Sequence, residues 1–266
     1  MPGKLVSVIL PCYNQGKYIE EAIQSVLSST YANIEIIIVN DGSTDAFTNE
    51  ILKQISWNKT IVYTIPNNGV AYVRNFGIGK SHGDYILPLD ADDRISQDYI
   101  EKSINILDAR PEVKIVYCEV EMFGAKKGKY PLPEYSIEMM LAQNTMVVSS
   151  MFRRTDFDKT PGYNRNMTFG FEDWDFWLTL LEDGGEVHKL EHVGLFYRIN
   201  RRSRNSSIKL DQYAKLRRQI YENHKKLFST HFLDPSKSFE YDLIRNSKEY
   251  KLGKAILKSI RFFLNY

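Results

Sequence analysis

Short apolar runs alternate with amphipathic segments through the first 120 residues or so of the chain. The runs typical of β-strands are Val6–Leu10, Ile34–Val39, Thr60–Ile65, Tyr85–Leu89 and Lys114–Cys118. The segments with helical spacing between them are Lys17–Ser28, Thr48–Ile55, Val70–Gly79 and Asp98–Asp108. This alternation predicts an α/β fold, with a Rossmann-like, mostly parallel sheet and helices on both of its faces.

The regularity weakens after about residue 120. The pattern there predicts an exposed loop over Phe123–Pro131, a helix around Ile137–Gln143 and a short strand near Val147–Arg153. Helices are predicted over Phe171–Asp183 and Leu210–Phe228, and Tyr241–Tyr266 is predicted to be a basic amphipathic tail. We expect one domain over residues 1–205, made of the halves 1–120 and 121–205. A helical extension over 206–266 would follow it.

Polar loops follow four of the predicted strands. They are Pro11-Cys12-Tyr13-Asn14, the segment from Asn40 to Asp45, Pro66-Asn67-Asn68-Gly69, and Asp90-Ala91-Asp92. These residue types are also ordinary turn formers. Because ligands of such sheets bind beyond the carboxyl ends of the strands, the four loops together predict a binding site at one rim.

Three carboxylates crowd into four residues after the fourth strand, at Asp90, Asp92 and Asp93. Unpaired carboxylates so close together repel each other, and a hard divalent cation relieves the repulsion. Mg²⁺ in such sites takes one or two carboxylates and fills its other positions with water and phosphate oxygens. The alternative is a solvated acidic turn that caps the next helix.

A second unusual segment runs from Phe169 to Leu178 and contains three acids and two tryptophans at a predicted helix start. Acids at a helix N-terminus complement the helix dipole, which would explain Glu172 and Asp173 without any function. The aromatic density of Trp174 and Trp177 beside them is instead typical of a sugar site, where a carboxylate could deprotonate a hydroxyl.

Composition and charge narrow the class of protein. The 266 residues carry 35 basic and 33 acidic side chains, so a net charge of +2 argues against nucleic acid as a partner. Cys12 and Cys118 lie in apolar runs, which suits a reducing compartment. The apolar run after Met1 is too short for a signal peptide, and no apolar stretch reaches the roughly 18 residues that span a bilayer. We expect a cytoplasmic protein whose oligomeric state the sequence leaves open.

Taken together, the loop and acidic motifs described above resemble those of family 2 glycosyltransferases of the GT-A fold. The motifs come in the family's order over residues 7 to about 200: Ser-Val-Ile-Leu-Pro-Cys-Tyr-Asn, Ile-Val-Asn-Asp-Gly-Ser-Thr-Asp, Asn-Asn-Gly-Val-Ala-Tyr-Val-Arg-Asn, Leu-Asp-Ala-Asp-Asp and Phe-Glu-Asp-Trp-Asp-Phe-Trp. The resemblance implies a metal-dependent, inverting transfer of one sugar from a nucleotide-sugar donor, with UDP as the predicted nucleotide. A saccharide or lipid-linked saccharide in bacterial O-antigen or capsule synthesis would accept it.

The resemblance also implies roles for individual residues. Tyr13 would lie near the uracil ring, Asp41 would read the base edge, Asp90 would lie near the ribose, and Asp92 would bind Mn²⁺ or Mg²⁺. Asp173 would be the general base, with Glu172 as the alternative. The full predicted donor set is Pro11, Tyr13, Asn14, Asp41, Ser43, Asn68, Arg74, Asp90, Ala91 and Asp92, with Asp90 and Asp92 as metal ligands and Trp174 and Trp177 as acceptor contacts.

One position departs from the family pattern. Members commonly carry a His two positions after Tyr-Arg that helps to hold the metal or the diphosphate, whereas Asn200 occupies that place here. A cationic run of Arg198, Arg201, Arg202 and Arg204 could clamp the diphosphate instead. A solvated basic loop is the other interpretation of this run.

Several alternatives stay open or fail on spacing. Arg74 occupies the place of the first glycine that a phosphate-binding loop ending at Gly79-Lys80-Ser81 would need, and Gly77, Gly79 and Gly83 miss the dinucleotide spacing. His188 and His192 are four apart but lie in a strand-like stretch. A sugar-phosphate nucleotidyltransferase and a non-catalytic sugar-binding protein remain alternatives. The tail could lie on an anionic membrane surface or pack against protein.

Overall fold

The computed structural model describes residues 3–200, 210–231, 236 and 239–263. Contacts divide the chain into two compact units. Unit 1 comprises Met1–Leu132 and Met146–His224, and unit 2 comprises Pro133–Thr145 and Lys225–Tyr266.

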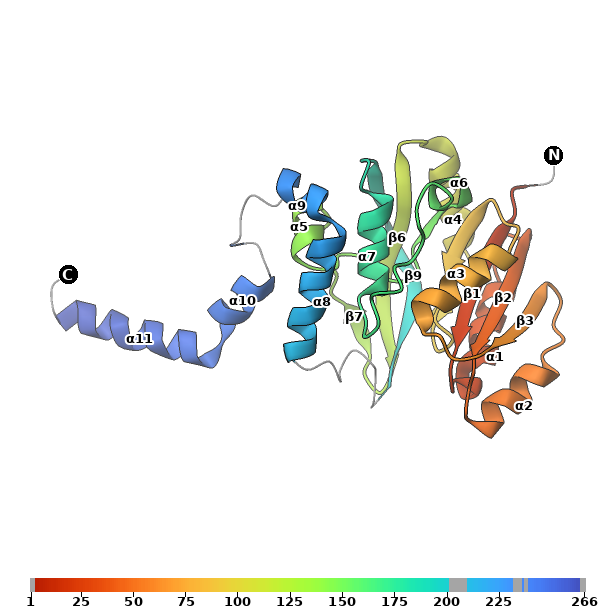
Figure 1. Cartoon of the computed structure of the whole chain (residues 1–266), viewed down its shortest axis with the longest axis horizontal. Coiled ribbons are helices and arrows are strands. Elements are labelled where there is room, and N and C mark those ends of the chain that lie inside the picture. Colours follow the sequence, from red (N-terminus) through yellow and green to blue (C-terminus); the bar gives the residue numbers. More distant parts are fainter. Residues whose placement is uncertain (1–2, 201–209, 232–235, 237–238, 264–266) are drawn as a thin grey trace. The chain divides into compact units, whose positions relative to one another are not determined.

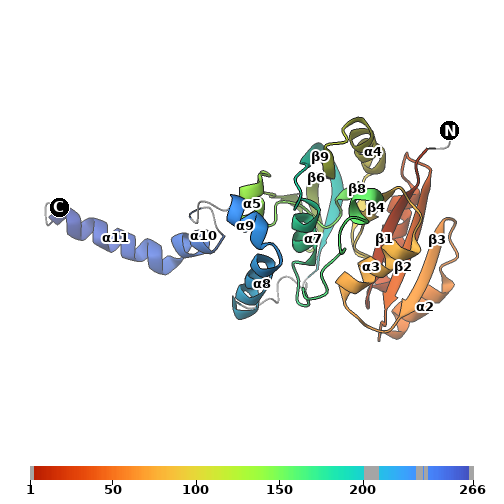
Figure 2. The same cartoon turned by 45° about the horizontal axis from the view of Figure 1, so that its top comes forward.

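Unit 1 is built on a nine-stranded sheet, formed by the described residues in the order β3-β2-β1-β4-β8-β6-β9-β5, with β7 paired to β6 (Figures 1 and 2). The strands are β1 (Val6–Cys12), β2 (Ile34–Asp41), β3 (Thr60–Ile65), β4 (Tyr85–Pro88), β5 (Arg94–Ile95), β6 (Val113–Gly124), β7 (Gly128–Tyr130), β8 (Met151–Arg153) and β9 (Glu186–Ile199). The pairs β1–β2, β1–β4, β2–β3 and β6–β9 are parallel. The predicted mostly parallel sheet is confirmed.

The helices of unit 1 cover both faces of this sheet. They are α1 (Gly16–Leu27), α2 (Ala46–Gln54), α3 (Val70–Lys80), α4 (Tyr99–Ala109), α6 (Arg154–Phe157), α7 (Glu172–Leu180) and α8 (Leu210–Asn223). Figure 1 shows α3 and α7 on the near face. On the other face Val8 and Leu10 of β1 share one apolar cluster with Ile19 of α1 and Ile100 of α4.

The central strands form because both of their faces are apolar. In β1, Val8 and Leu10 point to one face and Ile9 to the other, and all three are buried. On the Ile9 face, α3 approaches the sheet so closely that a Cβ on Gly77 would lie 2.7 Å from Cγ2 of Ile9. A side chain at position 77 would therefore push α3 away from the strands that hold the rim loops.

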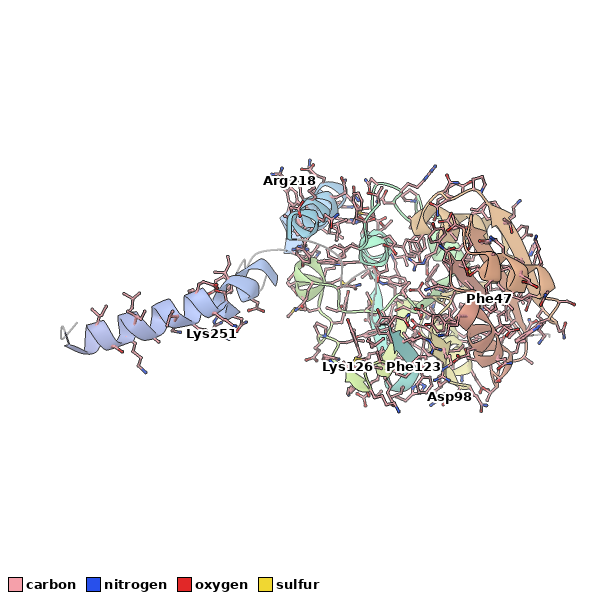
Figure 3. All side chains as sticks on the ribbon, turned by 90° about the horizontal axis from the view of Figure 1, so that it is seen from below. Phe47, Asp98, Phe123, Lys126, Arg218 and Lys251 are labelled. Atoms are coloured by element: carbon pink, nitrogen blue, oxygen red, sulfur yellow. The ribbon has the colours of Figure 1, made fainter. Side chains whose placement is uncertain are left out.

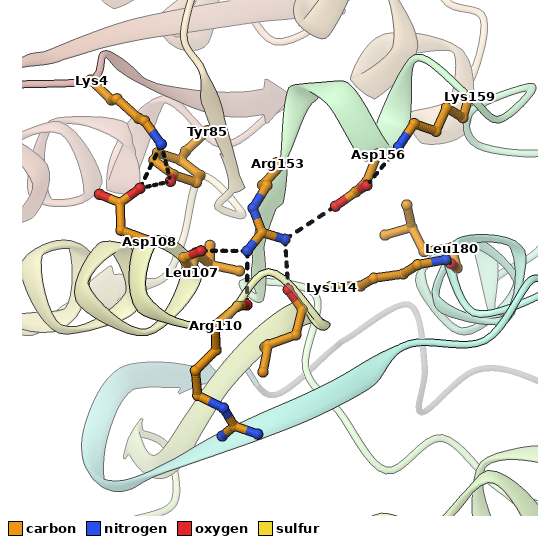
Figure 4. A network of polar contacts seen from close by, with 11 residues as sticks. Lys4, Tyr85, Leu107, Asp108, Arg110, Lys114, Arg153, Asp156, Lys159 and Leu180 are labelled. Carbon is orange, nitrogen blue, oxygen red and sulfur yellow. Dashed lines mark hydrogen bonds and ion pairs between the residues drawn. The ribbon is translucent and has the colours of Figure 1, made fainter.

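Arg153 ties the antiparallel strand β8 to its neighbours at the rim opposite the predicted site (Figure 4). Its guanidinium donates to the carbonyls of Val113 at 2.7 Å and Arg110 at 3.0 Å, and also to the carbonyl of Leu107. Nη1 lies 3.3 Å from Asp156 Oδ2. One side chain thus satisfies carbonyls at the end of α4 and the start of β6.

Unit 2 contains α5 (Ile137–Ala142), α9 (Lys225–His231), α10 (Phe239–Asn246) and α11 (Lys248–Phe263). Helix α5 begins at Ser136, whose Oγ accepts the amide of Met139 at 3.1 Å. None of the helices in the described ranges combines the length and the apolar character needed to cross a bilayer.

Two sequence expectations need correction. The segment Phe123–Pro131 is not a loop, because β6 continues to Gly124 and turns back into β7. The predicted helix Leu210–Phe228 is broken at His224 into α8 and α9. In each case the apolar spacing predicted helix or loop but carried no information about the break or the pairing. The helical spacing of the tail is confirmed, since α10 and α11 form there.

Candidate active site

The polar loops predicted to share one rim do meet there and enclose a pocket of about 320 Å³. The pocket is lined by Pro11, Cys12, Tyr13, Gln15, Asp41, Val70, Val73, Arg74, Asp90, Asp92, Tyr197, Arg198 and Asn200. Tyr13 is 46% exposed, so its ring offers a flat face to a ligand. The pocket lies at the carboxyl ends of β1, β2 and β4, as the parallel topology requires.

Asn14 and Ser43 join two of these loops to each other. Asn14 has a positive φ of 54°, and its Oδ1 accepts the amides of Thr44 and Asp45, each at 2.9 Å. The Ser43 hydroxyl accepts the Asn14 amide at 3.0 Å. Both side chains thus hold the two loops together in this structure, and neither lines this pocket.

Asp41 is held in place by the loop after β3. Its Oδ1 accepts the amide of Asn68 at 2.7 Å, and its Oδ2 accepts the amide of Gly69 at 3.0 Å. The Asn68 side chain instead donates to the carbonyl of Pro66, so Asn68 contributes its backbone to the site. The carboxylate of Asp41 is therefore a fixed acceptor at the pocket wall.

The acidic cluster after β4 lies partly in the pocket. Burial, and then the charge of Asp90, raises the pKa of Asp92 to about 6. Asp93 is fully buried and accepts the Arg198 amide at 2.8 Å, and burial raises its pKa well above the ordinary value. Ala91 is fully buried and does not line the pocket. Asp90 and Asp92 are thus the two carboxylates of this cluster that a ligand can reach.

Arg74 joins the acidic cluster to α7 from within the protein. Its Nη2 donates to Asp90 Oδ1 at 2.9 Å, and its Nη1 donates to Glu172 Oε1 at 3.0 Å. Arg74 is 1% exposed and Glu172 is 2% exposed. A buried carboxylate beside a guanidinium acts as its counter-ion, so Glu172 holds Arg74 rather than facing a ligand.

Asp173 is the half-buried acid next to Glu172. Burial, and then the charge of Glu172, raise its pKa to about 6, although the charge of Arg74 opposes both. The residue before this pair, Phe171, has a left-handed φ of 62° at the start of α7. Strained backbone of this kind concentrates at functional sites.

The two tryptophans do not form the predicted acceptor platform. Trp177 is fully buried and packs against the rings of Phe152 and Phe176, and Trp174 is 2% exposed beneath Phe171. Helix α7 has apolar residues around most of its circumference, so the rings near the acids belong to the core. The expected acceptor contacts are corrected accordingly.

Asn200 supports Asp92 through a hydrogen bond. Its Nδ2 donates to Asp92 Oδ2 at 2.8 Å, and its Oδ1 accepts the hydroxyl of Tyr18 at 3.2 Å. The prediction missed Tyr18, because nothing in its local sequence sets it apart from the other residues of a surface helix. Through this chain of bonds α1 fixes the carboxylate predicted to bind metal.

Arg198 is engaged within the protein in this structure. It donates to the carbonyl of Asp92 at 2.8 Å and to Glu21 Oε2 at 2.7 Å, and its guanidinium lies 4.5 Å from the ring centroid of Tyr18. The Arg198 side chain lines the pocket, but these contacts hold its guanidinium in the pocket wall. Arg202, with Arg201 and Arg204, lies outside the described residues.

A divalent cation fits this donor set. The described part of the chain contains no group of three His, Cys, Asp or Glu side chains arranged as a metal cage. Asp90 and Asp92 nevertheless open on one pocket, and the raised pKa of Asp92 shows that its negative charge is costly there without a compensating cation. This suits Mg²⁺ or Mn²⁺, which also take water and phosphate oxygens as ligands.

His188 and His192 have other partners. His188 lies 3.2 Å from Arg110 Nη1, and His192 lies 3.5 Å from Asp98. Both lie on β9, outside the pocket lining.

Sequence comparisons assign the chain to a known group. The family model described as glycosyl transferase family 2 matches residues 7–175. A putative teichuronic acid biosynthesis glycosyltransferase, TuaG of Bacillus subtilis, is 29% identical over 76% of this chain and 82% of its own. An uncharacterized glycosyltransferase of Haemophilus influenzae is 42% identical over 39% of this chain and 42% of its own. The match to this chain covers less than half of the length of the first such relatives.

Solved structures share the fold. S. aureus TarS 1-349 in complex with UDP-GlcNAc has a TM-score of 0.68 at 16% identity, over 94% of this chain and 78% of its own. The mannosyltransferase PcManGT of Pyrobaculum calidifontis, in complex with GDP-Man and Mn²⁺, has a TM-score of 0.64 at 16% identity, over 97% of this chain and 80% of its own. The predicted GT-A fold is confirmed.

Proposed function

Since the chain belongs to glycosyl transferase family 2, we propose that it transfers one sugar from a UDP-sugar to a saccharide or lipid-linked saccharide, with inversion at the anomeric carbon. The polymer built in this way is a bacterial surface polysaccharide, and the reaction takes place in the cytoplasm at the inner face of the membrane. Residues 1–205 form the catalytic domain, with the donor half over 1–120 and the acceptor half over 121–205, and 206–266 are an extension.

One observation carries the proposal. Asp41, Asp90 and Asp92 face a single pocket, and Arg74 links this pocket through Glu172 to the helix start that bears Asp173. The donor complexes of TarS with UDP-GlcNAc and of PcManGT with GDP-Man support a nucleotide-sugar as the ligand.

The residues divide the chemistry between them. Asp41 accepts hydrogen bonds from the nucleotide base, and the ring of Tyr13 packs on the face of that base. Asp90 lies near the ribose. Asp92, supported by Asn200, would hold the cation together with Asp90. When Mn²⁺ or Mg²⁺ is bound there, it supplies Lewis-acid neutralisation of the departing diphosphate.

Asp173 is the proposed general base. Its carboxylate takes the proton of the acceptor hydroxyl while the hydroxyl oxygen bonds to the anomeric carbon, and the bond from that carbon to the diphosphate oxygen breaks with its electron pair on the leaving nucleoside diphosphate. A pKa of about 6 suits this task, because the group is ionised at neutral pH and is still basic. The pairing of Glu172 with Arg74 supports Asp173 over Glu172 for this role.

Calorimetric titration tests the donor site. UDP, GDP, CDP and dTDP would each be titrated with Mn²⁺ and with EDTA into the native protein, into Asp92→Ala and into a matched control, Asp158→Ala, which removes an exposed carboxylate outside the pocket. We expect metal-dependent UDP binding that Asp92→Ala abolishes and Asp158→Ala retains. Failure of every nucleotide to bind the native protein would overturn the proposal.

A further inference from the structure

Helix α11 presents an exposed apolar face. We call this the α11 apolar face and define it as Leu252, Ile256, Leu257 and Ile260, which are 64%, 51%, 53% and 44% exposed. Residues at i, i+4 and i+8 lie on one side of a helix, and Leu257 adjoins them three positions before Ile260. Helices of folded proteins normally cover such a stripe with other apolar groups.

Lysines occupy the other side of the same helix. At 100° per residue, Lys251, Lys254 and Lys258 fall within about 60° of one another and opposite the α11 apolar face. Lys248 is a fourth exposed cation at the helix start, and Glu249 is the one acid between residues 248 and 260. Figure 3 shows Lys251 among the side chains of α11. The helix is therefore cationic on one side and apolar on the other.

We propose that α11 lies in the surface of an anionic lipid bilayer, with the α11 apolar face among the upper acyl chains and its lysines at the phosphates. A helix of 16 residues with this charge is too short and too polar to span a membrane, but a strong division into two faces suits binding in the membrane plane. Lysine stems extend along apolar surface while their ammonium groups reach the headgroups.

Charge favours lipid over protein as the occupant. A second copy of α11 pairing through the same apolar face would leave the lysines of both helices on the outer sides, facing water, where their charge adds nothing to the contact. An anionic bilayer instead offers negative charge along the whole length of the helix, and each lysine near its surface adds to the affinity.

Membrane binding by α11 rests on the proposed function only for its biological purpose, which is to hold the enzyme where a lipid-linked acceptor lies. Binding of lipid itself needs neither donor nor acceptor. A protein that binds UDP in solution but ignores vesicles would overturn this inference alone, and the opposite result would overturn the proposed function alone.

The test is flotation of the full-length protein with phosphatidylcholine vesicles and with vesicles in which part of that lipid is replaced by phosphatidylglycerol. One variant carries Leu252→Ser, Ile256→Ser, Leu257→Ser and Ile260→Ser. A second carries Lys248→Glu, Lys251→Glu, Lys254→Glu and Lys258→Glu. The matched controls are Phe47→Ser and Lys126→Glu, at exposed positions of unit 1 that Figure 3 also labels.

We expect the native protein and both controls to float with the anionic vesicles but not with phosphatidylcholine alone. Each α11 variant should bind roughly tenfold or more weakly, and high salt should weaken the native binding. Retained UDP binding would show that the variants are folded. Equal flotation of native protein and variants, no flotation of the native protein, or a native dimer that the serine variant dissociates would overturn the proposal.

Discussion

The guanidinium of Arg74 donates a hydrogen bond to the buried carboxylate of Glu172, a residue 98 positions further along the chain. Arg74 lies on α3 and lines the pocket, whereas Glu172 begins α7 beside the proposed base. The same guanidinium also binds Asp90. One buried cation therefore ties the start of α7, which bears Asp173, to the pocket.

Replacement of Arg74 should destabilise the fold. Arg74→Met leaves the carboxylate of Glu172 buried without its cation, and breaking such a pair costs about 3–5 kcal/mol in the free energy of unfolding. The double variant Arg74→Met with Glu172→Gln should recover part of this loss, because no charge is then left buried. Urea denaturation of both proteins measures the difference, and Arg110→Met, which breaks an exposed ion pair, serves as the control with little expected change.

Asp173→Asn should separate catalysis from binding. The amide cannot take a proton from the acceptor, so we expect kcat to fall by about 10²- to 10⁴-fold while UDP binding is retained. Glu172→Gln should instead lower the stability, since it alters the partner of Arg74. Steady-state kinetics with calorimetry on the same samples would distinguish the two acids. Unchanged turnover of Asp173→Asn would exclude it as the base.

Activity should decline on the acid side of neutrality. The pKa values of Asp92 and Asp173 are both raised to about 6, so both carboxyl groups become protonated as the pH falls through that value. A protonated Asp173 cannot act as a base, and a protonated Asp92 binds a cation poorly. We expect kcat/KM to fall below about pH 6, and a flat profile between about pH 5 and 7 would contradict these assignments.

The same two carboxyl groups should lower the stability of the metal-free protein as the pH rises. Because their pKa values are higher in the folded protein than in the unfolded chain, the folded state binds more protons between about pH 4 and 6, and their contribution to stability falls as the pH rises through this window. Asp92→Asn should therefore stabilise the metal-free protein more at pH 7 than at pH 5. Thermal unfolding of both proteins at the two pH values measures this difference.

Much of this site follows from the sequence, because parallel strands bring their carboxyl ends to one rim. The loops with Tyr13, Asp41 and Asp90 were predicted from turn residues after apolar runs, and the structure brings them together. The contacts of Asn14 and Ser43 were not predictable in the same way. A polar loop residue binds either a ligand or another loop, and spacing along the chain does not distinguish the two.

The errors around α7 have a related cause. Acids and tryptophans in one segment are typical of a sugar site, but a helix that is apolar on most sides turns its rings into the core. Whether Trp177 contacts Phe152 or a ligand depends on where β8 lies in the sheet. That strand pairs antiparallel with β4, and the paired residues are 66 to 68 positions apart in the sequence. Such long-range packing leaves no local pattern.

Loss of the Asn200 side chain should weaken cation binding. Asn200→Ala removes the donor to Asp92, and loss of such a supporting bond typically lowers metal affinity about 10- to 100-fold. Tyr18→Phe should have a smaller effect in the same direction, because it acts through Asn200. Titration of Mn²⁺ in the presence of UDP measures both variants against Asn58→Ala, an exposed amide outside the pocket. Equal affinity in all four proteins would show that Asn200 has no supporting role.

Asp175 anchors the end of α8 to α7 and should stabilise the packing of these two helices. Its carboxylate is fully buried and accepts Nδ2 of Asn164 at 2.8 Å, Nδ2 of Asn223 at 2.6 Å and Nε2 of His224 at 3.0 Å. Asp175→Ala leaves three donors without this acceptor, so we expect a loss of about 3–5 kcal/mol in the free energy of unfolding.

The effect of Asp175→Ala should also be local, because the other bonds of α7 remain. Asn223→Ala removes only one of the three donors and should cost about 1.5–3 kcal/mol. Hydrogen exchange should accelerate across Leu210–Asn223 in both variants and stay unchanged in α1, whereas Asp158→Ala should alter neither helix. If the amides of α8 kept their native protection in Asp175→Ala, the anchor would lie elsewhere, and the ring contacts of Tyr213 with Phe171 and of Arg217 with Trp174 would be the next to test.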